Sequence, residues 1–169
     1  PVSIKWYRAV DAFISAFRHP TVKPLSIVLF LMILSWNGFF SYISLFVLTR
    51  FHFTPSEVSF YMADMGAGFA IGCGYLVGFC SERYSLKSSA MVGIIFAALF
   101  IALIAWSHVQ WIAWVCVLWV GASIGVAYSN IVTMFSNQVD EAHQGWVMGV
   151  TGSVMAMGAA ISMFSLSFA

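Results

Sequence analysis

"MVGIIFAALFIALIAW", residues 91–106, is apolar on every face of any regular secondary structure. A strand of a membrane barrel alternates apolar and polar residues over about ten positions, and this stretch does not. A helix satisfies its own backbone hydrogen bonds, as the interior of a bilayer requires. The stretch therefore predicts a membrane-spanning helix and an all-α integral membrane protein.

The composition of the whole chain extends this prediction. Of its 169 residues, 62% are hydrophobic and 8% are charged, whereas soluble domains average roughly 45–50% and about 25%. Five segments have the length of about 20 apolar residues that one crossing needs. We expect these transmembrane helices at about 25–48, 56–80, 88–106, 110–135 and 144–168. The chain starts at Pro1 and stops inside the fifth apolar run, so we expect a fragment of a longer protein.

Nothing in the sequence indicates a cofactor, a metal site or a catalytic site. Cys73, Cys80 and Cys116 lie in apolar segments and are interpreted as small buried residues. The four histidines lie at segment ends or in loops, without metal-ligand spacing. No Ser/His pair, intramembrane carboxylate pair or HExxH motif favours an enzyme. A net charge of +1 without a basic cluster gives no indication of nucleic-acid binding.

The basic residues are distributed unevenly between the two sides of the predicted spans. Arg50 falls alone on one side, and six fall on the other: Lys5, Arg8, Arg18, Lys23, Arg83 and Lys87. By the positive-inside rule, the N-terminal segment and the loops 81–87 and 137–143 are cytoplasmic. The loops 49–55 and 107–109 then face outward. The predicted location is the inner (plasma) membrane of a bacterium.

Two local patterns frame the first two spans. Residues 1–24 place apolar side chains at helical spacing, which predicts an amphipathic juxtamembrane helix ended by Pro20 and Pro24. "TPSE" predicts a capping box at the start of the second span, with Thr54 as N-cap and Glu57 three residues later.

Asp64 is the one carboxylate predicted deep in the bilayer. It lies ten residues beyond Thr54, or about 15 Å along a helix. An ionised carboxylate there costs several kcal/mol unless water, a cation or a hydrogen-bond donor compensates. We interpret Asp64 as a cavity-facing group that binds a proton or a cationic substrate; a satisfied structural aspartate is the alternative. Tyr61, one turn away, is a possible hydrogen-bond donor. Both belong to a predicted polar stripe: Glu57, Tyr61, Asp64, Gly68 and Tyr75.

Further polar residues occur in the first and fourth spans, whereas the third has none between Met91 and Trp106. The third span is therefore expected to face lipid. The additional candidates for substrate or proton binding are Asn37, Ser41, Tyr42, Tyr128 and Asn130. The alternative for each is hydrogen bonding between helices. GxxxG spacings predict close helix packing at 68/72, 74/78, 121/125 and 145/149, with Gly152 beyond them.

The loop "GFCSERYSLK", residues 78–87, resembles the signature loop of the major facilitator superfamily, G-x-x-x-[DE]-R-x-G-[RK]-[RK]. The matching residues are Gly78, Glu82, Arg83 and Lys87. Ser85 and Leu86 depart from it, replacing a glycine and a basic residue, so the loop looks like the weaker second copy that the family carries between its eighth and ninth helices. "RHPTVKPL" (18–25) and "DEAHQGWVMGVTGSVMAMGAA" (140–160) also resemble this family, the latter most closely drug–proton antiporters of the tetracycline-resistance type.

The resemblance implies that the five spans are helices seven to eleven of twelve. We expect two domains, the juxtamembrane segment 1–24 and the helical domain 25–169. The resemblance implies a further N-terminal six-helix half elsewhere in the protein. It further implies alternating access to a small-molecule substrate, without a cofactor, and a coupling proton. We expect proton-coupled efflux of a lipophilic or amphipathic compound, as in multidrug antiporters. The alternatives are metabolite or sugar uptake within the same superfamily, a channel, or a membrane scaffold or receptor.

Overall fold

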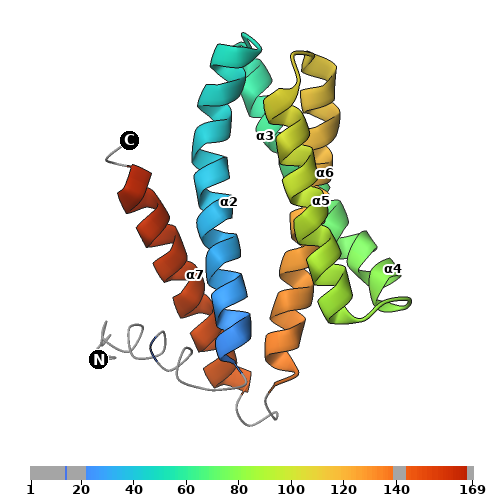
Figure 1. The fold of residues 1–169 in the computed structure, drawn as a ribbon, viewed down its shortest axis with the longest axis vertical. Coiled ribbons are helices and arrows are strands. Elements are labelled where there is room, and N and C mark those ends of the chain that lie inside the picture. The colour runs from blue at the N-terminus through green and yellow to red at the C-terminus, as the bar shows by residue number, and fades with distance from the viewer. Residues whose placement is uncertain (1–13, 15–21, 139–143, 167–169) are drawn as a thin grey trace. The chain divides into compact units, whose positions relative to one another are not determined.

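The computed structural model describes residues 14, 22–138 and 144–166, and every regular element in this part of the chain is a helix (Figure 1). The elements are α2 (Lys23–Arg50), α3 (Pro55–Ile71), the π-helix η1 (Gly72–Leu76), α4 (Val77–Ser81), α5 (Leu86–Trp106), α6 (Gln110–Ser136) and α7 (Gln144–Leu166). The all-α prediction is confirmed for these residues.

Five helices are long and apolar enough to cross a membrane. They are Lys23–Arg50, Pro55–Ser81, Leu86–Trp106, Gln110–Ser136 and Gln144–Phe164. Each of the five predicted spans coincides with one of these helices, with boundaries that agree within a few residues. The predicted amphipathic helix lies mostly outside the described residues. Pro24 lies in the first turn of α2, where proline is tolerated because its missing N–H would be unpaired anyway.

The chain divides into two compact units, and α2 and α6 contribute to both. One unit comprises residues 42–131, and the other comprises the described residues before and after them. In this second unit, α7 packs on α2. Ser162 donates a hydrogen bond to the Leu34 carbonyl oxygen over 3.5 Å, and Gly158 lies against Ile33.

In the unit of residues 42–131, α3 and α6 cross with their backbones in close approach. The glycines at the crossing are Gly68, Gly72, Gly121 and Gly125. A Cβ atom at any of them would collide with the facing backbone; on Gly125 it would lie 2.7 Å from the Phe69 carbonyl oxygen. Cys73 adds a bond from its thiol to the Gly125 carbonyl oxygen, at 3.5 Å. Glycine therefore allows a contact that alanine would prevent.

This crossing confirms the predicted role of the spacings 68/72 and 121/125. The other predicted spacings do not act in the same way. No described atom lies within 4 Å of a Cβ built on Gly74, Gly78, Gly145, Gly149 or Gly152. The prediction of close packing at those glycines is wrong for the described part of the chain, because no other described helix approaches them.

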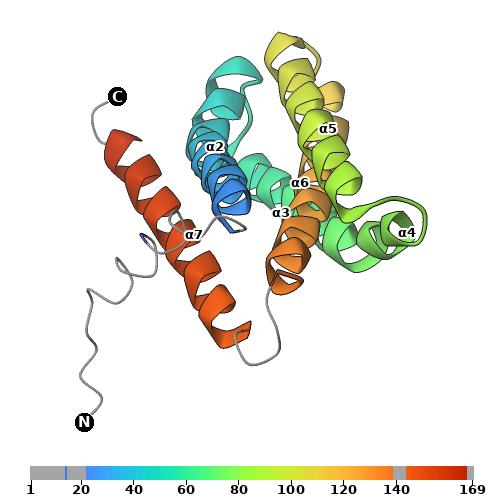
Figure 2. The same cartoon turned by 60° about the horizontal axis from the view of Figure 1, so that its bottom comes forward.

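The second span is not one continuous α-helix. At η1 the Val77 N–H donates to the carbonyl oxygen of Gly72, five residues earlier, which is a π-helical bond. Beyond this turn, α4 runs away from α6, as both views show (Figures 1 and 2). The span therefore has a half that is tightly packed on α6 and a half that is not.

The loops alternate between the two ends of this unit (Figure 1). At one end, an Arg50 guanidinium nitrogen lies 2.7 Å from Nδ1 of His108, and Gln110 Nε2 donates to the Phe51 carbonyl oxygen at 2.7 Å. The 82–85 turn lies at the opposite end. The loops 49–55 and 107–109 therefore lie at the same end of this unit, as the predicted order of spans requires.

The predicted capping box at the start of α3 is confirmed. The Thr54 N–H donates to Glu57 Oε2 at 2.7 Å, and the Glu57 N–H donates to Thr54 Oγ1 at 3.3 Å. Each residue thus satisfies a backbone donor that the first turn of the helix leaves unpaired. This cap fixes where the second span begins and hence the depth of Asp64.

Candidate functional site

Tyr61 forms the centre of an aromatic cluster on α3. Its side chain is fully buried, with the ring centroid 5.8 Å from that of Phe53 and 5.4 Å from that of Trp114. Both contacts are edge to face, an arrangement that aromatic rings favour. The Tyr61 hydroxyl has no hydrogen-bond partner among the described residues. A buried donor in this position is costly, which makes it a candidate for binding a group that the protein itself does not supply.

Asp64 lies one turn further along α3 and is half-buried. By sequence, Tyr61 is a possible hydrogen-bond donor to Asp64, but this bond is not formed in the structure. The reason is geometric. Side chains on a helix lean toward its N-terminus, so the long Tyr61 ring extends toward Phe53 and away from Asp64.

The predicted polar stripe of the second span is only partly present. Tyr61 and Gly68 lie on the buried face toward α6, with Asp64 half-buried beside them. Glu57 is exposed and engaged in the cap. Tyr75 lies inside η1 and is 71% exposed, so it does not continue the stripe. The extra residue of the π-turn breaks the α-helical spacing on which that prediction depended.

On α6, Asn130 is completely buried. Its Nδ2 donates to the Val126 carbonyl oxygen at 2.8 Å, whereas its Oδ1 has no partner among the described residues. Two residues earlier, the Tyr128 ring lies 6.1 Å from the ring of Phe69, centroid to centroid. Asn130 is therefore a second buried polar side chain with an unused hydrogen-bonding atom.

The candidates of the first span bond within their own helix. Asn37 Nδ2 donates to the Ile33 carbonyl oxygen at 2.8 Å, and Ser41 Oγ donates to the Asn37 carbonyl oxygen at 2.9 Å. Tyr42, the next residue, is exposed. Asn37 and Ser41 share a face of α2 and belong to the second unit, so the structure describes them separately from Tyr61 and Asp64.

The signature loop has a defined geometry. Gly78 lies in α4, and the Glu82 N–H donates back to its carbonyl oxygen at 3.3 Å. The Arg83 guanidinium lies 4.2 Å above the Phe79 ring centroid, a cation–π distance. Lys87 is exposed in the first turn of α5.

Ser85, which departs from the family's glycine, has a local function of its own. Its Oγ accepts a hydrogen bond from the Ser88 N–H at 3.2 Å and caps α5. Serine in place of the family's glycine therefore stabilises the start of the third span.

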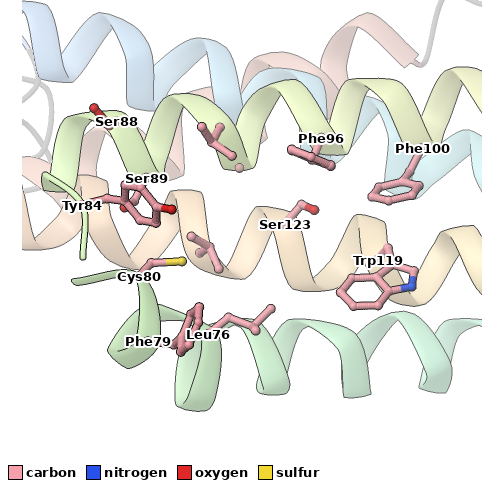
Figure 3. Close-up of a pocket in the computed structure, with 13 residues that line it drawn as sticks. Leu76, Phe79, Cys80, Tyr84, Ser88, Ser89, Phe96, Phe100, Trp119 and Ser123 are labelled. Carbon is pink, nitrogen blue, oxygen red and sulfur yellow. The ribbon is translucent and has the colours of Figure 1, made fainter. Parts of the chain in front are cut away.

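One pocket was missed by sequence reasoning (Figure 3). It has a volume of about 650 Å³ and lies between η1–α4, α5 and α6. Cys80 lines it and is half-buried, as is Cys73, so only Cys116 matches the prediction of a fully buried cysteine. Among residues 14, 22–138 and 144–166, no group of three or more His, Cys, Asp or Glu side chains is placed to hold a metal ion.

Five apolar helices, loops that alternate between two ends and the signature turn together define a helical membrane protein of the transporter type. The sequence model of the Major Facilitator Superfamily matches residues 4–163, and the chain belongs to that family, which comprises transporters and not enzymes.

A curated relative gives a more particular comparison. The chain is 24% identical over 157 residues to the tetracycline resistance protein, class C, of Escherichia coli. The match covers 93% of this chain and 39% of that protein, so the chain spans about two fifths of the relative's length. No solved structure matches the chain significantly.

Proposed function

We propose that this chain is part of a secondary transporter that works by alternating access and exports a lipophilic or amphipathic compound in exchange for protons. Family membership supports transport, and the similarity to a tetracycline resistance protein supports efflux. In this family of folds the substrate binds near the middle of the membrane, between helices that change their packing during the cycle.

Asp64 is the observation that carries the proposal. It lies about 15 Å along the helix from its cap at Thr54, near the middle of a hydrocarbon core about 30 Å thick. Its carboxylate has no hydrogen bond to the described residues, so the protein does not compensate its charge as it would for a structural aspartate. A proton, a cationic substrate or water in an open cavity would do so.

The proposed substrate class rests on two further groups in the same unit. The Tyr61 hydroxyl can donate a hydrogen bond and Asn130 Oδ1 can accept one, and both are buried without partners in the part of the chain that the structure describes. An aromatic ring, that of Trp114, packs beside Tyr61, and the same unit holds a second ring pair, Phe69 and Tyr128. Rings with a few polar atoms suit a compound that is mostly apolar but carries hydrogen-bonding groups.

We also infer that the five spans are helices seven to eleven of a twelve-helix protein, with the 82–85 turn in the cytoplasm of a bacterial cell. The signature loop has the weaker form that the family carries in its second half, which supports the assignment to helices seven to eleven. The excess of basic residues on the side of the 82–85 turn supports its cytoplasmic location. The six-helix half before it would supply the other wall of the substrate path.

The test is flux through the full-length gene product in proteoliposomes with an imposed pH gradient. The probes are tetracycline and a fluorescent lipophilic cation. We expect saturable flux of at least one probe, driven by the proton gradient and abolished by a protonophore.

Other results would favour the alternatives. Flux that rises linearly with concentration would indicate a channel. Saturable flux that does not depend on the pH gradient would indicate facilitated uptake. Binding of the probes without flux would indicate a scaffold or receptor.

A further inference from the structure

The α5 groove is the pocket between η1–α4, α5 and α6. Its lining residues are Leu76, Phe79, Cys80, Tyr84, Ser88, Ser89, Val92, Gly93, Phe96, Phe100, Trp119, Ser123 and Val126. We propose that it binds one acyl chain of an anionic phospholipid, whose headgroup lies against Arg83 and Lys87. This proposal does not depend on which compound is transported.

The length of the groove suits an acyl chain. Its α5 wall runs from Ser89 through Val92 and Phe96 to Phe100, at steps of three or four residues along one face. Figure 3 shows Ser89, Phe96 and Phe100 in this order along α5. Eleven residues of helix span about 17 Å, close to half of a hydrocarbon core about 30 Å thick. The groove therefore runs along about one leaflet, beginning at the end of the unit where the 82–85 turn lies.

The groove opens onto the face of α5 that we expect to contact lipid. The large apolar side chains on the exposed surface of this helix include Met91, Val92, Ile95, Phe96 and Leu99, each about half exposed. Val92 and Phe96 also line the groove. An acyl chain can therefore enter sideways from the bilayer without crossing a polar surface.

A polar group lies at the headgroup end. Ser89 is only 5% exposed, and its Oγ has no hydrogen-bond partner among the described residues. It lies in the first turn of α5, beside Ser88 and Tyr84 at one end of the groove (Figure 3). A phospholipid carries its ester carbonyl oxygens between headgroup and acyl chain, so an acceptor for the Ser89 hydroxyl would lie at this depth.

Charge at this end selects the headgroup. Arg83 is held above Phe79, which lines the groove, and Lys87 begins the helix that forms its wall. With Glu82 as the only acid, the turn carries one net positive charge. Basic residues at a membrane surface attract anionic lipids. An anionic phospholipid supplies both a negative headgroup for this charged end and ester oxygens for the Ser89 hydroxyl.

The experiment is native mass spectrometry of the full-length protein with phosphatidylglycerol or phosphatidylcholine added. We expect phosphatidylglycerol to bind more tightly. Val92→Trp should fill the groove and abolish this adduct. Met91→Trp, which places the same side chain at a neighbouring exposed position outside the groove, should retain it. Lys87→Gln should weaken phosphatidylglycerol binding roughly fivefold, while Lys23→Gln should not.

The native cysteines give a second readout in the unmodified protein. Cys80 lines the groove and Cys73 does not, although both are half-buried. Phosphatidylglycerol should slow alkylation of Cys80 and leave Cys73 unchanged, as measured by peptide mapping. Equal adducts in Val92→Trp and Met91→Trp, or equal affinity for the two lipids, would overturn the proposal. Tetracycline that protects Cys80 where phosphatidylglycerol does not would also overturn it.

Discussion

The ring of Tyr61 meets the ring of Trp114 edge to face with centroids 5.4 Å apart, while its hydroxyl is buried with no partner in residues 22–138 and 144–166. Ring and hydroxyl therefore have opposite effects on stability. The ring joins α3 to α6 through aromatic packing. The hydroxyl loses its hydrogen bonds to water and gains none from the described residues, so a role other than folding accounts for it best.

Removing this hydroxyl should separate the two effects. We expect Tyr61→Phe to keep the thermal stability or raise it by about 1 kcal/mol, because a buried unpaired donor is removed. Tyr61→Ala should lose about 3–5 kcal/mol through the cavity left behind. Thermal unfolding in detergent measures both. If the hydroxyl binds substrate, Tyr61→Phe should also bind the transported compound more weakly; a large loss of stability in Tyr61→Phe would instead indicate a structural hydrogen bond.

Asp64→Asn keeps the shape of the side chain and removes its charge. We expect the variant to fold and reach the membrane, but to lose flux driven by a proton gradient or affinity for a cationic substrate. Flux in proteoliposomes at several values of pH provides the measurement. Ser59→Ala, an exposed change on the same helix, serves as the control. Unchanged flux and pH profile in Asp64→Asn would leave Asp64 with a structural role only.

The crossing of α3 and α6 predicts a contrast between two glycines. A Cβ at Gly121 would collide with the Met65 backbone, whereas no described atom lies within 4 Å of one at Gly66. Gly121→Ala should cost about 1–3 kcal/mol through overpacking. Gly66→Ala should stabilise by up to about 1 kcal/mol, since alanine is the better helix former. The measurement is the unfolding temperature of each variant relative to the unmodified protein. Equal shifts in the two variants would mean that α3 and α6 are not in backbone contact.

Arg83 should affect the rate of transport more than substrate binding. It lies at the end of the second span, after α4, and Asp64 lies two thirds of a span away on α3. We expect Arg83→Ala to lower flux while the equilibrium affinity stays near that of the unmodified protein. Flux and equilibrium binding should be measured on the same preparation. A large loss of binding with normal turnover would contradict this role.

The orientation is testable by cysteine labelling in a background without the three native cysteines. Cysteines at positions 85 and 141 should react with an impermeant reagent only from the cytoplasmic side. A cysteine at position 52 should react only from outside. Reaction of position 85 from outside would reverse the assignment of both ends.

Sequence reasoning succeeded where the signal was local or rested on bulk hydropathy. The spans follow from the length of apolar runs, and the cap at Thr54 follows from two residues whose side chains bond to each other's backbone. The glycine spacings 68/72 and 121/125 were also found, because close helix packing requires small residues. A spacing alone could not show which glycines face another helix, so 74/78 was indistinguishable from them.

The sequence did not predict the direction of side chains on a helix or the contacts between residues that are distant in the sequence. The Tyr61–Asp64 pair is adjacent on the helix, but helical side chains lean toward the N-terminus and separate the two polar ends. The α5 groove joins residues from three segments, and its aromatic wall in α5 looked like any lipid-facing surface. The π-turn has no side-chain pattern of its own, since it is a change of backbone bonding.

That turn has a geometric consequence for the whole span. Each residue advances a helix by about 100°, so one extra residue rotates everything after it by about that angle. Gly68 and Phe79 must therefore be placed on two different helical wheels, although they belong to one span. Deleting Gly74, which has no side chain, would restore a plain α-helix and rotate Arg83 around the axis without removing any side chain. The direction in which this span presents its terminal charge is thus determined by a residue count in its middle.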